Sequence, residues 1–142
     1  MPITPISKVL LAEDDSDDRM FFETFLTGRT DMLLLGSVEN GAELIETLRS
    51  GDETQELPDI IILDQNMPKM NGLETLKLLK STKRYTHIPV VIYSTYINDK
   101  LIESCLVSGA SLVLAKPDGR DGYLMMMDKM LEVVNAGNQS PS

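Results

Sequence analysis

The 142-residue sequence contains one cysteine, one histidine and no tryptophan. Cys105 has no second cysteine with which to form a disulfide bond, so other interactions must hold the fold together. His87 lies in a polar stretch ahead of an apolar run, with no second histidine or cysteine near it to complete a transition-metal site. We therefore expect His87 to be a solvated loop residue.

Basic residues and long apolar runs are also scarce. The 13 lysines and arginines are outnumbered by 22 acidic residues, which gives a net charge of −9. Such a surface repels phosphate backbones and anionic lipids, so direct binding to nucleic acid or to a membrane is not expected. No apolar run approaches membrane-spanning length, and the opening MPITPIS lacks the basic start and apolar stretch of a signal peptide. A cytoplasmic location is expected.

Hydrophobic residues make up 42% of the chain, which is enough for the core of one compact domain at this length. Short apolar runs alternate with longer amphipathic stretches, a pattern typical of parallel strands connected by covering helices. The predicted strands are Lys8–Ala12, Met32–Val38, Asp59–Leu63, Pro89–Tyr93 and Ser111–Ala115. The predicted helices lie near Ser16–Leu26, Gly41–Ser50, Gly72–Ser81, Asn98–Val107 and Arg120–Asn135.

These elements predict a single α/β domain over residues 8–135. A short lead, residues 1–7, precedes the domain. Residues 136–142 form a polar tail with too little apolar content to pack, and we expect this tail to be disordered.

Polar side chains follow four of the five predicted strands, at the point where each strand ends. Ligands and chemistry gather at the carboxyl ends of the strands in an open parallel sheet. The second strand is followed only by an ordinary loop, in which Asn40 is expected to cap the next helix. The residues after the first, third, fourth and fifth strands are Glu13, Asp14 and Asp15, then Asp64, then Ser94 and Thr95, and finally Lys116 and Pro117.

If those four strands are neighbours, several carboxylates, a hydroxyl and an ammonium group converge on one small site. Clustered carboxylates repel one another unless a cation neutralises them, and hard oxygen ligands suit Mg²⁺ better than zinc or copper. Asp64 could then act as a nucleophile toward a phosphoryl group. Lys116 and the metal would balance the charge of the phosphoryl oxygens, while Ser94 would donate a hydrogen bond to one of them.

Each motif also has an ordinary structural explanation when it is taken alone. An aspartate after a strand is more often a helix cap or turn former than a nucleophile, and Lys-Pro and Ser-Thr usually mark turns or caps. A haloacid-dehalogenase-like phosphatase would need a second carboxylate two residues after its nucleophile, where this chain has Asn66. A flavodoxin-like cofactor carrier would need a phosphate-binding loop after the first strand, where this chain is acidic. The joint occurrence of the four motifs favours the phosphate acceptor.

The motifs LAEDD, LDQNMPKMNG, VIYST and AKP resemble, in order and spacing, the receiver domains of bacterial two-component response regulators. The resemblance covers about residues 8 to 135, and it implies a flavodoxin-like, doubly wound (βα)5 fold with strand order 2-1-3-4-5. The EDDSDDR opening, the IPVVIYST run and the lack of an attached domain are similar to stand-alone receivers of the phytochrome-partner type. The presence of every expected group argues against a degenerate receiver that is never phosphorylated.

The resemblance implies that Asp64 is the phosphorylated residue, Ser94 the switch hydroxyl and Lys116 the lysine that contacts the phosphoryl group. It implies that Mg²⁺, which Mn²⁺ could replace, is held by Glu13, Asp14, Asp64 and the backbone carbonyl of Asn66. The phosphoryl donor is then a sensor histidine kinase or a histidine phosphotransfer protein. The chain is expected to be a signalling phosphoacceptor and not an enzyme.

In the matched motifs Asp14 faces the site, whereas Asp15 begins the turn of the first helix. The resemblance also implies a cis peptide bond before Pro117, as a tight strand-to-loop turn favours.

With no output domain in the sequence, the signal is expected to leave by contact with a downstream protein or through a homodimer. Val113 occupies the place where many receivers carry an aromatic switch residue, so we assign the switch to the loop containing Thr95 and Tyr96. On the last helix, Tyr123, Met126 and Met130 form a second apolar stripe. This stripe is either part of a broad core face or an exposed patch for a partner.

Overall fold

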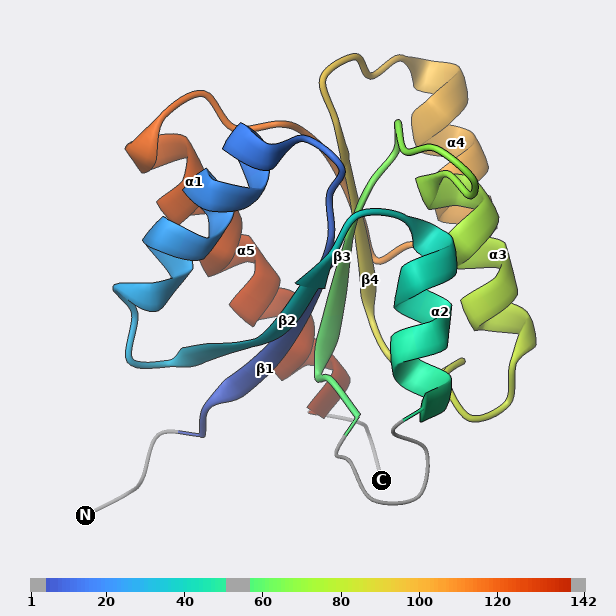
Figure 1. Cartoon of the computed structure of the whole chain (residues 1–142), viewed down its shortest axis with the longest axis horizontal. Helices are drawn as coiled ribbons and strands as arrows, with labels where there is room; N and C mark the ends of the chain where they lie inside the picture. The colour runs from blue at the N-terminus through green and yellow to red at the C-terminus, as the bar shows by residue number, and fades with distance from the viewer. Residues whose placement is uncertain (1–4, 51–56, 139–142) are drawn as a thin grey trace.

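The computed structural model of the protein describes residues 5–50 and 57–138. Its strands form one parallel sheet in the order β2-β1-β3-β4-β5, and Figure 1 shows α1 and α5 on one side of it and α2, α3 and α4 on the other. The strands are β1 (Ser7–Ala12), β2 (Met32–Val38), β3 (Ile60–Asp64), β4 (Val90–Ser94) and β5 (Leu112–Ala115). The helices are α1 (Ser16–Thr27), α2 (Gly41–Ser50), α3 (Gly72–Ser81), α4 (Asp99–Val107) and α5 (Arg120–Asn138). The predicted fold class and strand order are confirmed.

Asparagine side chains cap the starts of α2 and α4. The Asn40 side chain accepts a hydrogen bond from the backbone N–H of Glu43 at 2.9 Å, which confirms it as the cap of α2. Asn98 lies just outside α4 and caps it by accepting from Leu101 N at 2.8 Å. Near the C-terminus, helix α5 continues beyond the predicted limit of Asn135 to Asn138.

Apolar side chains cover both faces of the sheet, because alternate residues of each strand point to opposite sides. Strands β3 and β4 are buried along their whole length. The core on the side of α1 and α5, called the α1/α5 core below, is formed by Val9, Leu11, Phe22, Leu26, Met32, Ile60, Ile62, Val91, Tyr93, Tyr123, Met126, Met127, Met130 and Val134. A second core packs β1, β3 and β4 against α2, α3 and α4.

The apolar stripe Tyr123, Met126 and Met130 belongs to the α1/α5 core. These three side chains are exposed by only 2%, 2% and 0% of their surface, so the alternative of an exposed partner patch is wrong. The methionines bend into the space between α5 and the sheet, where Tyr123 stacks near Phe22 and Phe25. The large hydrophobic side chain of this helix that does face solvent is Met125, which is 63% exposed.

The Lys116–Pro117 peptide bond is trans, since the described part of the chain has no cis peptide bond. The prediction of a cis bond before Pro117 is therefore wrong. The trans form is the ordinary one even before proline, by about 0.5–1 kcal/mol. The chain turns from β5 toward α5 through Gly119, whose φ of +93° suits a residue without a Cβ.

Among the described residues, no helix is both long and apolar enough to span a lipid bilayer.

We expect Gly41→Ala to destabilise the protein by about 1–3 kcal/mol, because the start of α2 is packed tightly against α3. A Cβ at Gly41 would overlap Thr75 Oγ1 and lie 3.0 Å from the carbonyl oxygen of Met70. Neither group can retreat easily, since Gly41 N donates to Met70 O and Thr75 Oγ1 donates to Asn71 O. Urea unfolding followed by circular dichroism measures the change.

The matched control is Gly137→Ala in α5, where a Cβ would have no neighbour within 4 Å. Helix propensity predicts that this variant is unchanged or more stable by up to about 1 kcal/mol. An equal loss of stability in both variants would contradict the packing argument.

Candidate functional site

Three carboxylates meet at the carboxyl edge of the sheet. Glu13 and Asp14 follow β1, and Asp64 is the last residue of β3. Each offers an oxygen atom that lies within 4.8 Å of the others. Glu13 and Asp64 are exposed by only 0% and 2%, whereas Asp14 is exposed. The sheet order explains this meeting, because β1 and β3 are adjacent and Ala12 pairs with Leu63.

The ammonium group of Lys116, just after β5, lies among carboxylates from three different segments. Its Nζ atom is 2.9 Å from Asp18 Oδ2 and 3.3 Å from Asp64 Oδ2. The same Nζ is 3.1 Å from Glu13 Oε1 and 3.3 Å from Glu13 Oε2. An ammonium group has three N–H donors, so all of them are engaged with carboxylates.

Tyr93 in β4 is the second group that stabilises the buried Glu13 carboxylate. Its hydroxyl donates a hydrogen bond of 2.6 Å to Glu13 Oε1, and the Tyr93 side chain is fully buried. The ring lies 5.4 Å from Lys116 Nζ, which allows a cation–π contact. Tyr93 also packs edge-on against Phe22 of α1, so it connects the acidic site to the α1/α5 core.

The loop after β3 returns to the site through Asn66. Its backbone N–H donates to Asp64 Oδ1 at 3.2 Å, and its side-chain amide donates to Ser94 Oγ at 3.3 Å. Ser94 is fully buried at the end of β4. The loop can close this tightly because Gly72 lacks a Cβ, which would lie 2.8 Å from the carbonyl oxygen of Asp64.

Asp14 and Asp15 have different positions although they are adjacent. Asp15 is the N-cap of α1 and accepts from the backbone N–H of Asp18 at 2.9 Å. Asp14 belongs instead to the carboxylate cluster. The two predicted switch residues Thr95 and Tyr96 are exposed, and Tyr96 is 83% exposed. Val113 is half-buried and packs against the core on the side of α4.

The site has more negative charge than Lys116 can balance. Burial and the neighbouring Glu13 carboxylate raise the pKa of Asp64 to about 8, although Lys116 and the Asn66 N–H act in the opposite direction. Burial lowers the pKa of Lys116, but hydrogen bonds to Asp18 and Glu13 outweigh that effect and raise it overall. Burial and the charge of Glu13 likewise raise the pKa of Tyr93, so its hydroxyl remains a donor. A further cation would therefore bind favourably among these oxygens.

Two residues of the site were not predicted from the sequence. Asp18 belongs to the acidic run EDDSDD, and its reach to Lys116 depends on how α1 crosses the sheet. Tyr93 lies in an apolar run and looks like a core residue, which it also is. The sequence of β4 did contain a signal for the position of Tyr93. Neighbouring side chains of a strand point to opposite faces, so Tyr93 must lie on the face of the sheet opposite to that of Ser94.

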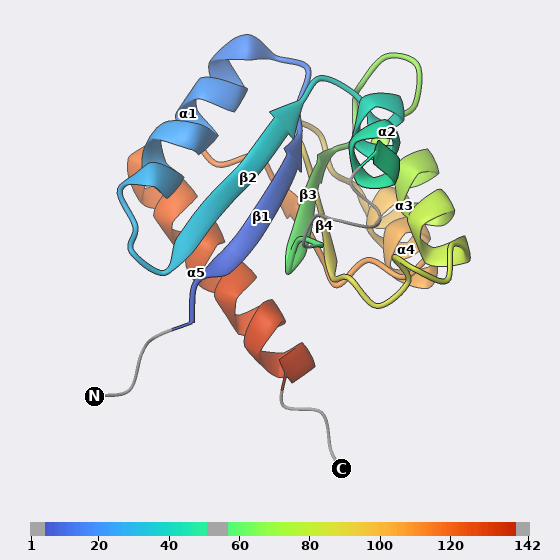
Figure 2. The same ribbon diagram turned by 60° about the horizontal axis from the view of Figure 1, so that its bottom comes forward.

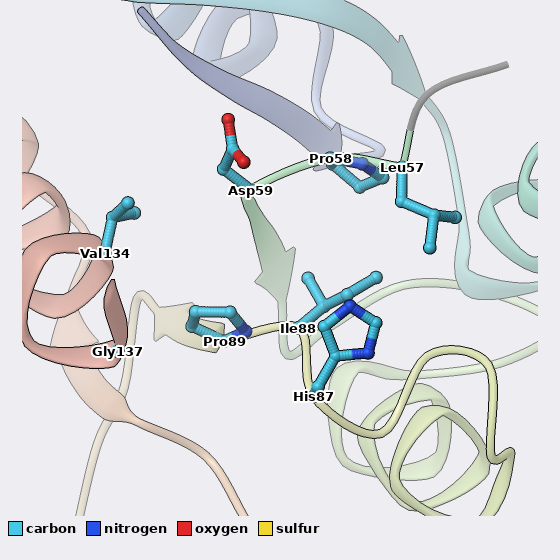
Figure 3. Close-up of a pocket in the computed structure, with 8 residues that line it drawn as sticks. All are labelled: Leu57, Pro58, Asp59, His87, Ile88, Pro89, Val134 and Gly137. Atoms are coloured by element: carbon cyan, nitrogen blue, oxygen red, sulfur yellow. The ribbon is translucent and has the colours of Figure 1, made fainter. Parts of the chain in front are cut away.

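A separate pocket of about 320 Å³ lies at the other end of the sheet (Figure 3). Its walls come from the segments before β3 and β4 and from the end of α5, with Asp59, His87 and Val134 among them. His87 is exposed there, as the sequence suggested. The pocket contains no cluster of acidic or nucleophilic groups comparable to the site at the carboxyl edge.

The family model of the response regulator receiver domain matches residues 9–127 of the chain. The two-component response regulator ARR17 of Arabidopsis thaliana is 34% identical over 116 residues, which cover 77% of this chain and 74% of ARR17. A protein-glutamate methylesterase/protein-glutamine glutaminase of Clostridium acetobutylicum is 31% identical over 127 residues, but this chain spans only 35% of its length.

Two solved response regulators have the same fold. The phosphorylated cyanobacterial phytochrome response regulator RcpA superposes with a TM-score of 0.80 at 28% identity, covering 96% of this chain and 99% of RcpA. The Mn²⁺-bound form of the response regulator Rcp1 superposes with a TM-score of 0.75 at 26% identity, covering 86% of this chain and 90% of Rcp1.

We expect Tyr93→Phe to destabilise the protein by about 1–3 kcal/mol, because it removes a hydrogen bond from a carboxylate that has no access to water. The change deletes only the hydroxyl and keeps the ring in the α1/α5 core. Tyr96→Phe deletes the same atom from a side chain that is 83% exposed, so its stability should be unchanged. Urea unfolding of the three proteins tests this, and equal midpoints for all of them would contradict the importance of the Tyr93–Glu13 bond.

Proposed function

Because this chain belongs to the response regulator receiver family, whose members are phosphoacceptors in signalling, we propose that Asp64 accepts a phosphoryl group from the phosphohistidine of a histidine kinase or phosphotransfer protein. The observation that carries the proposal is the position of Asp64 at the carboxyl edge of the sheet. Its carboxylate lies beside Glu13 and Asp14 and 3.3 Å from Lys116.

The donor set fits a divalent cation. Carboxylate oxygens from two strand ends lie close together, and no soft ligand is among them. Mg²⁺, or Mn²⁺ in its place, would be held by Glu13, Asp14, Asp64 and the backbone carbonyl of Asn66, and would supply positive charge against the phosphoryl oxygens. The Mn²⁺-bound Rcp1 structure, which has the same fold, supports this choice of metals.

In the transfer step a carboxylate oxygen of Asp64 forms a bond to phosphorus. The bond between phosphorus and the imidazole nitrogen of the donor breaks, and the imidazole leaves with the electron pair. Lys116 donates to a phosphoryl oxygen and balances part of its charge. The Ser94 hydroxyl, which accepts a hydrogen bond from the Asn66 amide, would donate its own hydrogen to another phosphoryl oxygen. The side chains of the site thus position the phosphoryl group and balance its charge, while the phosphorus–nitrogen bond of the phosphohistidine supplies the free energy of the transfer.

The acidic surface and the proposed phosphohistidine donor agree with a cytoplasmic signalling protein. Its output is contact with a downstream protein or with a second copy of the chain. We do not propose a methylesterase activity for this chain, because it spans only 35% of the relative that is named for that activity. The similarity to RcpA, a phytochrome response regulator, makes a phytochrome-type kinase a specific candidate for the donor.

Incubation with Mg²⁺ and a small acyl- or amido-phosphate should add one acid-labile phosphoryl group, measured by intact mass. Asp64→Asn keeps the size of the side chain but removes the nucleophile, so this protein should gain no such mass. Chelation of the metal should also prevent the addition in the parent protein. Addition to Asp64→Asn at the parent rate would overturn the proposal.

The switch is proposed to lie in the loop after β4, because Val113 is short and β-branched and cannot swing inward as an aromatic side chain does. Ser94 lies at the end of β4, and Tyr96, two residues later, is 83% exposed and free to change its contacts. A bias of a few kcal/mol between two arrangements of this loop is enough to report phosphorylation.

Tyr96→Ala should therefore leave phosphorylation at Asp64 nearly unchanged but reduce the response of α4. The measurement is hydrogen exchange over residues 94–107 before and after phosphorylation, with Val113→Ala as the comparison. A parent-like response in Tyr96→Ala, together with a lost response in Val113→Ala, would place the switch on β5 instead.

A further inference from the structure

The ion pair between Lys116 and Asp18 is the shortest that Lys116 makes, at 2.9 Å. Asp18 lies in the first turn of α1, outside the cluster of Glu13, Asp14 and Asp64. Its backbone N–H is fixed by the side chain of Asp15, which caps the helix. The lysine is thus tied to a helix by a carboxylate outside the cluster that is proposed to hold the metal.

We propose that Asp18 is a positioning residue that competes with the phosphoryl group for Lys116 and so slows the phosphorylation of Asp64. The inference rests on the proposed function of Asp64. It concerns the state before transfer, in which Asp18, Glu13 and Asp64 engage the three N–H donors of Lys116.

A phosphoryl oxygen can gain a hydrogen bond from Lys116 only if one of those carboxylates yields its place. Glu13 is the least able to yield, because it is fully buried and would keep only the Tyr93 hydroxyl as a side-chain donor. Asp64 itself bears the incoming group. Asp18 is the easiest to release, since 30% of its side chain is exposed, compared with 0% for Glu13 and 2% for Asp64.

Asp18 also adds negative charge beside the place where a phosphoryl group with its own negative charge must arrive. Both effects slow the phosphorylation of Asp64. Removal of the Asp18 charge would free an N–H group of Lys116 and would reduce the repulsion of the incoming phosphoryl compound. While no phosphoryl group is present, Lys116 freed from Asp18 would turn toward Glu13 and Asp64. It would then compete more strongly with a divalent cation for their oxygens.

The test compares Asp18→Asn with Asp17→Asn. Asp17 lies in the same first turn of α1 and is exposed, so it controls for the loss of one charge near the helix start. Asp18→Glu restores the charge as a conservative variant. Phosphorylation by a small amido-phosphate is followed by intact mass at saturating Mg²⁺, and Mg²⁺ affinity is measured separately by calorimetry.

At saturating Mg²⁺ we expect Asp18→Asn to be phosphorylated roughly threefold to fivefold faster than the parent, the scale of one partly exposed ion pair. Its affinity for Mg²⁺ should fall by a similar factor. Asp17→Asn should change the phosphorylation rate and the Mg²⁺ affinity only by the small, salt-screened effect of one surface charge. Asp18→Glu should restore the parent values of both. A merely structural role of Asp18 would not move these two quantities in opposite directions.

The Lys116→Gln background tests whether Asp18 acts through the lysine. There, the loss of Mg²⁺ affinity caused by Asp18→Asn should be much smaller, as a double-mutant cycle requires for coupled groups. A rate for Asp18→Asn that is equal to or lower than the parent rate overturns the inference, and so does an unchanged Mg²⁺ affinity. If the parent takes up no phosphoryl group, the proposed function of Asp64 fails and the inference fails with it, whereas a parent that reacts like Asp18→Asn refutes the inference alone.

Discussion

The ion pairs of Lys116 are the interactions on which the rest of the site depends. A single ammonium group stabilises carboxylates from the ends of β1 and β3 and from α1, two of which are almost completely buried. Without it, Glu13 and Asp64 would be uncompensated charges in a medium of low polarity, which is strongly unfavourable. Even with it, the pKa of Asp64 is raised to about 8, so the balance remains incomplete. That shortage of positive charge agrees with the fit of the Glu13, Asp14 and Asp64 cluster to a divalent cation.

The parallel sheet explains why such an unfavourable cluster can exist. Strands β1, β3, β4 and β5 are neighbours in the sheet, and Figure 2 shows β1, β3 and β4 side by side. The polar residues at or just after the ends of these strands therefore arrive at the same edge. Below that edge the strands are packed on both faces, and Tyr93 continues from the α1/α5 core to the Glu13 carboxylate. The apolar core therefore holds the charged groups in place, and their repulsion is opposed by packing rather than by solvent.

The sequence predicted most of this arrangement because its signals are local. Apolar runs mark the strands, and the polar residues that follow them identify Asp64, Ser94 and Lys116 as neighbours once the strand order is known. Asp18 could not be assigned in this way, since its contact with Lys116 spans 98 positions of the chain and depends on how α1 packs. For the stripe with Tyr123, the periodicity of the sequence allowed either a core face or an exposed patch, and only the packing of α5 against α1 decides between them. The trans bond before Pro117 likewise could not be read from the dipeptide.

The contacts of the site suggest that a phosphoryl group would act on two segments at once. Lys116 joins the site to α1 through Asp18, whereas Asn66 joins it to the end of β4 through Ser94. A new anion on Asp64 would attract both the ammonium and the hydroxyl. Lys116 would have to release one of its carboxylates, whereas the Ser94 hydroxyl, which only accepts from Asn66, would donate its own hydrogen. The same event would therefore loosen Asp18 from Lys116 and reorient the Ser94 hydroxyl, directly before the loop that begins at Thr95. An exposed side chain in that loop, such as Tyr96, could then respond without any movement of the buried sheet.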